Sequence, residues 1–578
     1  MLHQSSKKYF IVVLIFVVLS LSILLGNYLF FLEKELSSQS KVLTISAGIV
    51  PSDLITRETM EKFFQRLAIE EGLKTIVLIG QQIFLEREDS NFISLPIGEK
   101  EFWGTLIDQD FLTKLAGKET FVFREKELFP KSNLVNLVPF INQYLPKVKI
   151  VPLIVPDNLS LDEVKNFVSI LDSLTNLQTM VVASVNFSNG LPASVAALHD
   201  QKSIRTLTNF EEDNFSNIEV TSWQTLYIVR DFARRRQKEV SEIITYKNSA
   251  DYQKEKSVSG TTSYLSLLFK EGFFEEKNDL GVSLLFTGDI MLDRGVAVWL
   301  KREGYFYPFQ KISQLFEGVD ILCGNLEGPI VKEKIQFPRH SLTFNFDSAV
   351  VEALSQAKFN LINLANNHTL NRGRSGLEQT HDFLETANIN WVGDPVQCNQ
   401  SANLFEEEDV IFLAFDQTLS ASCSDKEIER MIKEAKEFSQ SKYLIVFFHW
   451  GEEYRLQNSS RQQELAHLVI DAGADLIIGS HPHVVQNIEK YQGKLIFYSL
   501  GNFVFDQYFS EETQQGLVLG VGLFPEKTIF YLFPVGGELS QPYLMDSLSK
   551  ENFLAELAQR SSLELADFIR EEVIIIKR

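Results

Sequence analysis

The chain has 578 residues, of which 45% are hydrophobic and 23% charged, and its formal net charge at pH 7 is -21. This composition is typical of a globular protein, and the negative charge argues against nucleic acid as a partner, because phosphate binding requires clustered lysine and arginine. The three cysteines, Cys323, Cys398 and Cys423, are too few for a disulfide framework, although they could form one bridge.

The segment at residues 9–31 is almost entirely apolar and long enough to cross a bilayer, which takes about 20 residues in a helix. Lys7 and Lys8 precede it, so the positive-inside rule places residues 1–8 in the cytoplasm and the rest of the chain outside. A cleaved signal peptide is the alternative, but it would have a shorter apolar core and a cleavage site of small residues. We therefore expect a single-pass protein anchored in the cell membrane, with extracytoplasmic domains.

Residues 42–273 alternate short apolar runs with helical patterns, which predicts an α/β layer fold. The apolar runs at 75–80, 149–155 and 180–185 are typical of buried strands. Apolar residues spaced three and four apart predict helices at 161–174 and 222–240.

This first region resembles the family called AmmeMemoRadiSam system protein B, or Memo, through GIVP at 48–51 and VVASVNFSN at 181–189, together with the strand patterns above. The resemblance implies the class III extradiol dioxygenase fold. Other residues stand where that family has metal-binding histidines or their neighbours: Ser52, Asp53, Gln81, Gln82, Ser132, Asn133 and Asn189. The region has a single histidine, His199, so we expect a Memo-like domain without metal ligands, acting as a scaffold or as a module that binds a ligand or partner.

Residues 281–545 form a second region in which each strand-like run ends in a polar cluster. The clusters contain Asp289, Asn325, Asn366, His449, Ser480 and Asn502. Ligands of α/β sheets gather at the carboxyl ends of the strands, where loops held by rigid strands can place side chains around one point. Residues 549–578 are predicted to form a helical extension without chemistry of its own.

The side chains of these clusters suit a metal site. Oxygen and nitrogen ligands without thiolates suit Mn, Fe, Zn or Mg. Taken alone, Asp289 could cap a helix and His449 could be a packed histidine. The occurrence of several ligand-type clusters in one region, including His481-Pro482-His483, favours a shared site over separate structural roles.

Six motifs in order resemble the CapA family within the calcineurin-like metallophosphoesterases: GDIMLDRGV, GNLEGPI, NLANNHTLNRG, FFHWGEEY, GADLIIGSHPHVVQ and IFYSLGNFVFDQ. The match covers about residues 282–508. It implies a four-layer α/β fold, one or two divalent ions, and a role in the synthesis or export of a poly-γ-glutamate capsule.

The resemblance also implies roles for individual residues. His368 matches the proposed general acid, and the metal ligands by motif position are Asp289, Glu327, Asn367, His449, His481 and His483. Two residues depart from the wider phosphoesterase pattern, since Met291 replaces a histidine and Asn325 replaces a bridging aspartate. A thioether is a poor ligand for hard metals. A single metal on Asn367, His449 and His481 is therefore the better-supported expectation.

The candidate substrate-binding residues are Arg294, Arg372 and Asn325. An arginine can hold a carboxylate or phosphate with two hydrogen bonds. Either arginine could instead form a structural ion pair. Three functions remain open: a metal-dependent phosphoester hydrolase, a metal-containing component that binds a polyanionic polymer together with synthesis or export proteins, and a structural surface protein with two relic enzyme domains.

Overall fold

The computed structural model describes residues 43–81, 93–96, 99–118, 122–123, 132–253, 260–272, 281–338, 341–407, 409–418, 423–439 and 441–578. The predicted membrane anchor at 9–31 and the position of Gln82 lie outside these residues. Within the described ranges, no helix is both long and apolar enough to cross a membrane.

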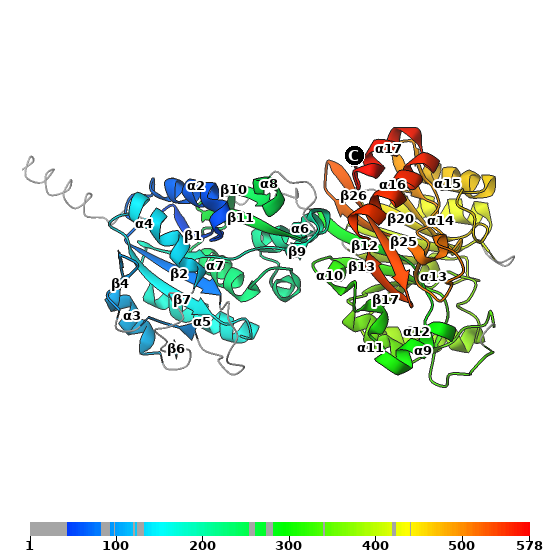
Figure 1. Ribbon diagram of the computed structural model, residues 1–578, viewed down its shortest axis with the longest axis horizontal. Helices are drawn as coiled ribbons and strands as arrows, with labels where there is room; N and C mark the ends of the chain where they lie inside the picture. Colours follow the sequence, from blue (N-terminus) through cyan, green and yellow to red (C-terminus); the bar gives the residue numbers. More distant parts are fainter. Residues whose placement is uncertain are drawn as a thin grey trace, which may run out of the picture. The chain divides into compact units, whose positions relative to one another are not determined.

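The chain divides into two compact units (Figure 1). The first comprises Met1–Val185, Gln224–Tyr246 and Leu265–Phe274, and the second comprises Asn186–Trp223, Lys247–Tyr264 and Glu275–Arg578. Two segments of the region that the sequence presents as one domain, 186–223 and 247–264, thus belong to the second unit, and His199 goes with them.

The first unit has a parallel core of four strands in the order β1, β8, β2, β7. Their bounds are Ile45–Ile49, Thr179–Ala183, Thr75–Gln81 and Lys149–Val155. The other strands are β3 (Ile93–Ser94), β4 (Glu101–Phe102), β5 (Thr105–Leu106), β6 (Val122–Phe123), β10 (Val240–Asn248) and β11 (Thr261–Lys270), the last two running into the second unit. The helices are α2 (Arg57–Leu67), α3 (Gln109–Ala116), α4 (Val138–Tyr144), α5 (Leu161–Leu174) and α7 (Trp223–Arg235).

Small polar side chains occupy the positions where the resemblance to Memo leads us to expect histidines or their neighbours. Ser52 is buried after β1, and the Asn133 amide lies 3.4 Å from the Ser184 hydroxyl. His199 lies on α6 (Ala193–Asn209) of the second unit, where it pairs with Glu219 and its Nε2 is 3.1 Å from the Leu315 carbonyl oxygen. The resemblance of this unit to Memo remains a prediction.

The second unit contains two large sheets. The nine-stranded sheet has the order β17, β16, β13, β12, β25, β26, β27, with β24 on β12 and β28 on β26. These strands are β12 (Val282–Ile290), β13 (Ile321–Leu326), β16 (Leu361–Asn363), β17 (Asn390–Val392), β24 (Asn502–Val504), β25 (Gln515–Leu523), β26 (Lys527–Glu538), β27 (Gln541–Leu544) and β28 (Val573–Lys577). Because β28 pairs with β26, the predicted C-terminal extension adds a strand to this sheet.

The six-stranded sheet has the order β18, β19, β20, β21, β23, β22, with parallel pairing from β19 through β23. Its strands are β18 (Leu404–Glu407), β19 (Val410–Asp416), β20 (Tyr443–His449), β21 (Leu476–Ser480), β22 (Ile488–Tyr491) and β23 (Lys494–Phe497). The unit also contains three short strands. The strand β9 (Asn189–Leu191) pairs with β11, and β14 (Ile330–Val331) pairs with β15 (Phe346–Asp347).

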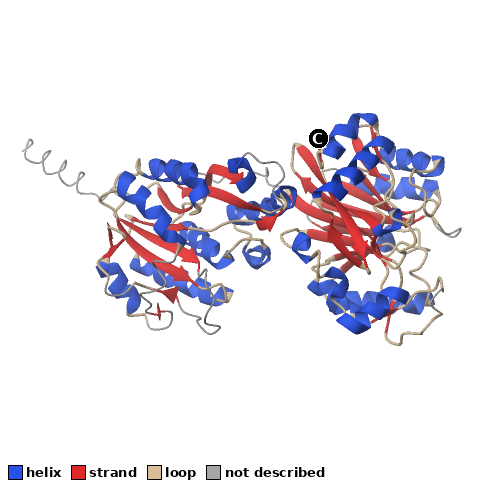
Figure 2. Ribbon diagram, viewed as in Figure 1, coloured by secondary structure: helices blue, strands red, loops and turns tan. Residues whose placement is uncertain are grey.

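The two sheets pack face to face, with helices on their outer faces (Figure 2). Alternate residues of a strand face opposite sides, so Leu284 and Phe286 enter the core between the sheets while Leu285 faces the helices. The helices are α6 (Ala193–Asn209), α8 (Ser249–Gln253), α9 (Arg294–Glu303), α10 (Ser313–Phe316), α11 (Val350–Gln356), α12 (Gly373–Thr386), α13 (Gln400–Asn403), α14 (Asp425–Phe438), α15 (Ser460–Ala472), α16 (Ser547–Arg560) and α17 (Ala566–Arg570). The result is the expected order of helix, sheet, sheet and helix layers.

One disulfide joins Cys398 to Cys423, and Cys323 is free and buried. Disulfides persist in oxidising compartments outside the cytoplasm. A bridge that closes a loop with a sequence separation of 25 removes conformational entropy from the unfolded chain.

Replacing both Cys398 and Cys423 by serine is expected to lower the free energy of unfolding of the second unit by about 3.5 kcal/mol, the chain-entropy value for a loop of this length. Denaturant unfolding of the oxidised wild type and the double variant measures the difference. Adding dithiothreitol should destabilise the wild type and leave the variant unchanged. Equal stability of the two oxidised proteins would contradict the prediction.

Candidate metal centre

The candidate centre lies where strands of both sheets end. In the nine-stranded sheet, Asp289 of β12 pairs in register with Asn325 of β13 and with Asn502 of β24. Gly288 permits this convergence, since a Cβ at that position would lie 1.9 Å from the Gly501 carbonyl oxygen. In the six-stranded sheet, His449 of β20 stands opposite Ser480 of β21.

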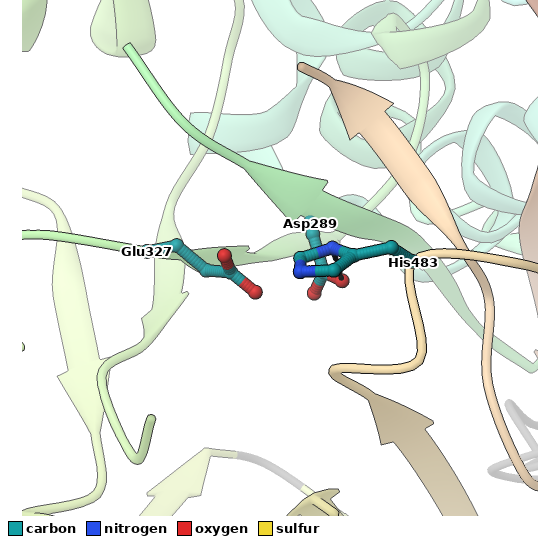
Figure 3. Close-up of side chains that lie close together, drawn as sticks. All are labelled: Asp289, Glu327 and His483. Carbon is teal, nitrogen blue, oxygen red and sulfur yellow. Dashed lines mark ion pairs between the residues drawn. The ribbon is translucent and has the colours of Figure 1, made fainter. Parts of the chain in front are cut away.

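Three buried side chains meet at this point: Asp289, Glu327 and His483. One ligand-type atom of each lies within 4.8 Å of the others, and Figure 3 shows both carboxylates and the imidazole facing a common space. The Asp289 Oδ2 atom is 3.4 Å from His483 Nδ1. Two carboxylates and an imidazole form a donor set suited to a divalent cation.

Glu327 provides a test of whether a cation fits. Its side chain is completely buried, and its Oε2 atom has no hydrogen-bond partner. Burial raises the pKa of Glu327 well above its usual range, and the neighbouring Asp289 carboxylate raises it further. Burying two carboxylates side by side is unfavourable unless a cation or proton compensates their charge. A divalent ion fits this arrangement.

A second ligand set, Asn367, His449 and His481, adjoins the first. His449 Nε2 lies 3.0 Å from Asn367 Oδ1, and the rings of His449 and His481 are 4.8 Å apart between centroids. Burial lowers the pKa of His449 well below its usual range and that of His481 to about 4, so both imidazoles are neutral, as ligation requires. Glu327 Oε1 is 3.7 Å from His449 Nε2 and therefore lies between the two sets.

Asn325 turns its amide nitrogen, not its oxygen, toward the centre. The Leu326 carbonyl accepts from Asn366 Nδ2 at 2.9 Å, and the same nitrogen donates to Asn325 Oδ1 at 3.2 Å. Asn363 Nδ2 also donates to this oxygen, at 3.2 Å. Asn325 Nδ2 is thereby directed at Asp289 Oδ1, 2.8 Å away. Asn325 is only 4% exposed and donates to Asp289. Its position therefore suits the orientation of a metal-ligand candidate rather than the direct contact with substrate that the sequence predicts.

Met291 points away from the metal ligands. It is fully buried in the core beside the helices of the nine-stranded sheet, and its sulfur accepts a hydrogen bond from the Asp293 amide at 3.1 Å. Met291 therefore supplies no ligand atom, and the side chains that meet at the centre are Asp289, Glu327 and His483. The structure thus brings these three side chains together as a ligand set. This set adjoins the set of Asn367, His449 and His481 that the sequence favoured.

The His481-Pro482-His483 turn holds its histidines in an uncommon conformation. Their φ angles are +96° and +58°, in the left-handed region that residues other than glycine rarely adopt. Such a conformation costs of order 1–3 kcal/mol per residue and is commonly found at functional sites. The turn places the backbone amide of His481 3.3 Å from Asp289 Oδ2.

His368, the candidate general acid, has a fixed proton position. Asn371 Oδ1 accepts from the Phe344 backbone amide at 2.7 Å, so this oxygen also accepts from His368 Nδ1, 3.2 Å away. The Nε2 atom is left as the proton acceptor. Burial lowers the pKa of His368 to about 4, which keeps the imidazole neutral at pH 7.

Arg294 is held beside the centre by two rings and a carboxylate. Its guanidinium carbon lies 4.9 Å from the Phe344 ring centroid and 5.6 Å from that of Phe505, and one of its nitrogens pairs with Asp506. The Nε atom is buried without a partner. Arg372 has a different, structural role. It donates to Asn345 Oδ1 at 2.9 Å and to the Glu333 carbonyl at 3.3 Å, and these hydrogen bonds stabilise the segment before β15.

The sequence motifs did not single out all the residues at the centre. Phe344 lies 4.3 Å from the His368 ring between centroids, yet it comes from a segment without a ligand-type motif. Asn502 contacts His483, although the sequence placed it only in a polar cluster and a motif and assigned it no role.

Comparison with known proteins agrees with the CapA resemblance of the sequence motifs. The family model described as bacterial capsule synthesis protein PGA_cap matches residues 283–507. The PGA biosynthesis protein CapA of Bacillus subtilis (strain 168) is 31% identical over 305 residues, which cover 49% of this chain and 79% of that protein. The capsule biosynthesis protein CapA of Bacillus anthracis is 32% identical over 258 residues, which cover 41% of this chain and only 63% of that protein.

Among solved structures, an uncharacterised Escherichia coli K12 protein aligns over 99% of its length and 39% of this chain, at 13% identity and a TM-score of 0.27. A TM-score of this size bears on neither fold nor function.

The second unit is therefore a two-sheet α/β sandwich with a carboxylate–imidazole centre at its strand ends. The chain belongs to the CapA family of capsule and poly-γ-glutamate biosynthesis proteins.

Proposed function

We propose that the second unit binds divalent metal at this centre and hydrolyses a phosphoester. The observation that carries the proposal is the buried Glu327 carboxylate, whose Oε2 atom has no partner while Asp289 and His483 face the same space. The two ligand sets, which Glu327 links, would hold one or two ions, with Mn, Fe, Zn and Mg as the candidates.

A divalent ion bound there would polarise a phosphoryl oxygen and lower the pKa of a coordinated water toward about 7. The chain's own residues would orient the substrate and move the proton. Arg294 offers an unpaired donor to an anionic oxygen, and His368 Nε2 would carry the proton that the leaving oxygen requires. Because the pKa of His368 is about 4, this role requires a substrate whose negative charge raises that pKa.

The assay is hydrolysis of phosphomonoesters and phosphodiesters by the full-length chain loaded in turn with Mn²⁺, Zn²⁺, Fe²⁺ or Mg²⁺. Metal content per chain is measured on the same samples. We expect metal-dependent turnover that EDTA removes. A chain with full metal content and no turnover on any ester would refute the hydrolase.

We further propose that the protein acts at the cell membrane in the synthesis or export of an anionic surface polymer of the poly-γ-glutamate type, together with other synthesis or export proteins. The family membership, the predicted anchor at 9–31 and the disulfide all support this placement. Protease added to intact spheroplasts should cleave the second unit. Protection until the membrane is lysed would contradict an extracytoplasmic location.

The first unit would serve there as a scaffold or partner-binding domain. Its proposed Memo-like character without metal ligands is supported by the small polar residues Ser52 and Asn133 near the ends of its strands. Metal analysis of a full-length variant with the second-unit ligands removed would test this, since any remaining bound metal would contradict it.

A second function is supported by a specific observation. His368 is neutral at pH 7 and Met291 lies in the core, which favours a metal-containing component that binds a polyanion without cleaving it. Poly-γ-glutamate binding by the metal-loaded chain, without release of any product and unaffected by His368→Ala, would favour this function over hydrolysis.

Arg294→Lys is expected to weaken anion binding about 10-fold or more, since a charge-assisted hydrogen bond contributes about 1.5–3 kcal/mol. Lysine cannot reproduce the planar fork that Phe344, Phe505 and Asp506 hold in place. The readout is the inhibition constant of inorganic phosphate, or KM if a substrate is found. Arg372→Lys is the matched control and should leave the constant near wild type. Equal effects of the two substitutions would contradict a binding role specific to Arg294.

A further inference from the structure

The metal-ligand candidate His483 is held by a chain of polar contacts through Asn502, a residue to which the sequence assigned no role. His483 Nδ1 lies 3.0 Å from Asn502 Oδ1, and both side chains are buried. Asn502 Nδ2 makes two contacts of its own, 2.9 Å to the Thr513 carbonyl oxygen and 3.0 Å to Gln507 Oε1.

These contacts fix the orientation of the Asn502 amide. A backbone carbonyl can only accept, so the side-chain atom facing the Thr513 oxygen must be the nitrogen of Asn502. The Asn502 oxygen is then the atom that faces His483. Because an amide oxygen can only accept, His483 Nδ1 must carry the proton.

The proton on Nδ1 leaves Nε2 with its lone pair. Asp289 Oδ2, a second acceptor 3.4 Å from Nδ1, favours the same tautomer. In Figure 3 the ring nitrogen farther from the His483 backbone is turned toward Glu327, into the space that the three ligand candidates share. Histidines that bind metals commonly donate their other N–H group to a fixed acceptor, which sets the tautomer and orients the ring.

We propose that Asn502 is a positioning residue that selects the Nδ1–H tautomer of His483 and so presents Nε2 to a metal. This inference rests on the metal centre proposed above. Gln507 supports the amide, and its Nε2 donates to the hydroxyl of Tyr454 at 3.2 Å. The Tyr454 ring lies 6.2 Å from that of His483 and is 43% exposed, so the chain of contacts runs from the surface to the ligand.

Two substitutions separate this role from a general structural one. Asn502→Leu removes the acceptor for His483 and both donors, whereas Asn502→Asp keeps an acceptor and removes both donors. A tautomer-selecting role predicts that leucine is harmful and aspartate is tolerated. A structural role predicts that both are harmful, because both lose the contacts to Thr513 and Gln507.

The first measurement is Zn²⁺ affinity of the full-length chain by competition with a chelating dye. We expect Asn502→Leu to bind Zn²⁺ about 10–100-fold more weakly than wild type, and Asn502→Asp to bind it as tightly as wild type or more so. Asn403→Leu is the matched control, because Asn403 is equally buried and donates to the Asn399 carbonyl at 3.0 Å without contact to the centre. Wild-type affinity in Asn502→Leu, or equal losses in the leucine and aspartate variants, would overturn the proposal.

The second measurement is the ¹⁵N spectrum of metal-free, histidine-labelled protein, with the His483 signals assigned by their absence in His483→Gln. We expect protonated Nδ1 in wild type and Asn502→Asp, and a mixture of tautomers in Asn502→Leu. A protonated Nε2 in wild type would overturn the proposal. This readout needs no bound metal, so it tests Asn502 even if the wild type fails to bind Zn²⁺ and the proposed centre is refuted.

Discussion

Replacing Glu327 by glutamine is expected to abolish divalent-metal binding without destabilising the metal-free protein. The Glu327 carboxylate lies between the two ligand sets, within 4.8 Å of the ligand atoms of Asp289 and His483 and 3.7 Å from His449 Nε2. Glutamine keeps the shape of the side chain and removes the negative charge that a cation requires. If two ions bind, we therefore expect both to be lost.

The same substitution should change how the metal-free protein responds to pH. The pKa of Glu327 is raised in the folded state, above the value of about 4.3 in an unfolded chain. The folded state then binds the proton more tightly, so stability falls as pH rises from about 4.3 through the folded pKa. Glu327→Gln removes this loss, and the variant should gain stability relative to metal-free wild type over that pH range.

Thermal unfolding with and without Mn²⁺, together with elemental analysis, measures both effects. At a metal concentration 100 to 1,000 times Kd the wild type should gain about 2.7–4.1 kcal/mol. In a unit this large 1 kcal/mol shifts the Tm by about 1–2 °C, so the Tm of the second unit should rise by roughly 3–8 °C. The variant should gain nothing. Glu551→Gln, which removes an exposed carboxylate of α16, is the control and should behave as wild type. Loss of one ion of two would contradict the position of Glu327 between the sets.

The sequence motifs predicted which ligand-type residues lie near Glu327, because each motif follows directly after a strand in the chain. Each ligand-type cluster follows a buried strand, and parallel strands bring their carboxyl ends to one edge, so Asp289, His449 and His483 could be placed together from the sequence. The role of Asn325 could not be read in this way. Its orientation depends on Asn366 and the Leu326 carbonyl, which fix an amide that the sequence leaves free to turn either way.

Helix α6 shows why the boundary of the second unit was not predictable. Residues such as His199, Lys202 and Arg205 are typical of an exposed helix, yet all three are buried. Each of them has a partner more than 100 residues away. His199 contacts the Leu315 carbonyl at 3.1 Å, Lys202 donates to the Val319 carbonyl at 3.0 Å, and Arg205 donates to Asp320 at 2.7 and 2.8 Å. The spacing of apolar residues along the helix carries no information about such distant pairs. Because many residues of α6 are polar, the sequence predicts an exposed helix and not a buried one.

His368→Ala is expected to lower turnover of an alkyl phosphoester about 10²–10⁴-fold, the usual contribution of a general acid. The proton on His368 Nδ1 is directed at Asn371, so delivery to a leaving oxygen requires a second proton on Nε2, which the charge of the bound substrate would stabilise. A poor leaving group such as an alkoxide needs that proton, whereas p-nitrophenolate leaves readily without it. On a p-nitrophenyl ester the same variant should therefore lose far less, about 10-fold or under.

The metal content of His368→Ala should equal that of wild type, because His368 contacts Asn371 and Phe344 and is outside the two ligand sets. His467→Ala is the control, since His467 is a half-buried histidine stacked on Tyr491 away from the ligands. The ratio of losses on the two esters decides the role of His368. Equal losses on both would mean that His368 orients the substrate without protonating it, and an unchanged rate on both would remove it from the reaction.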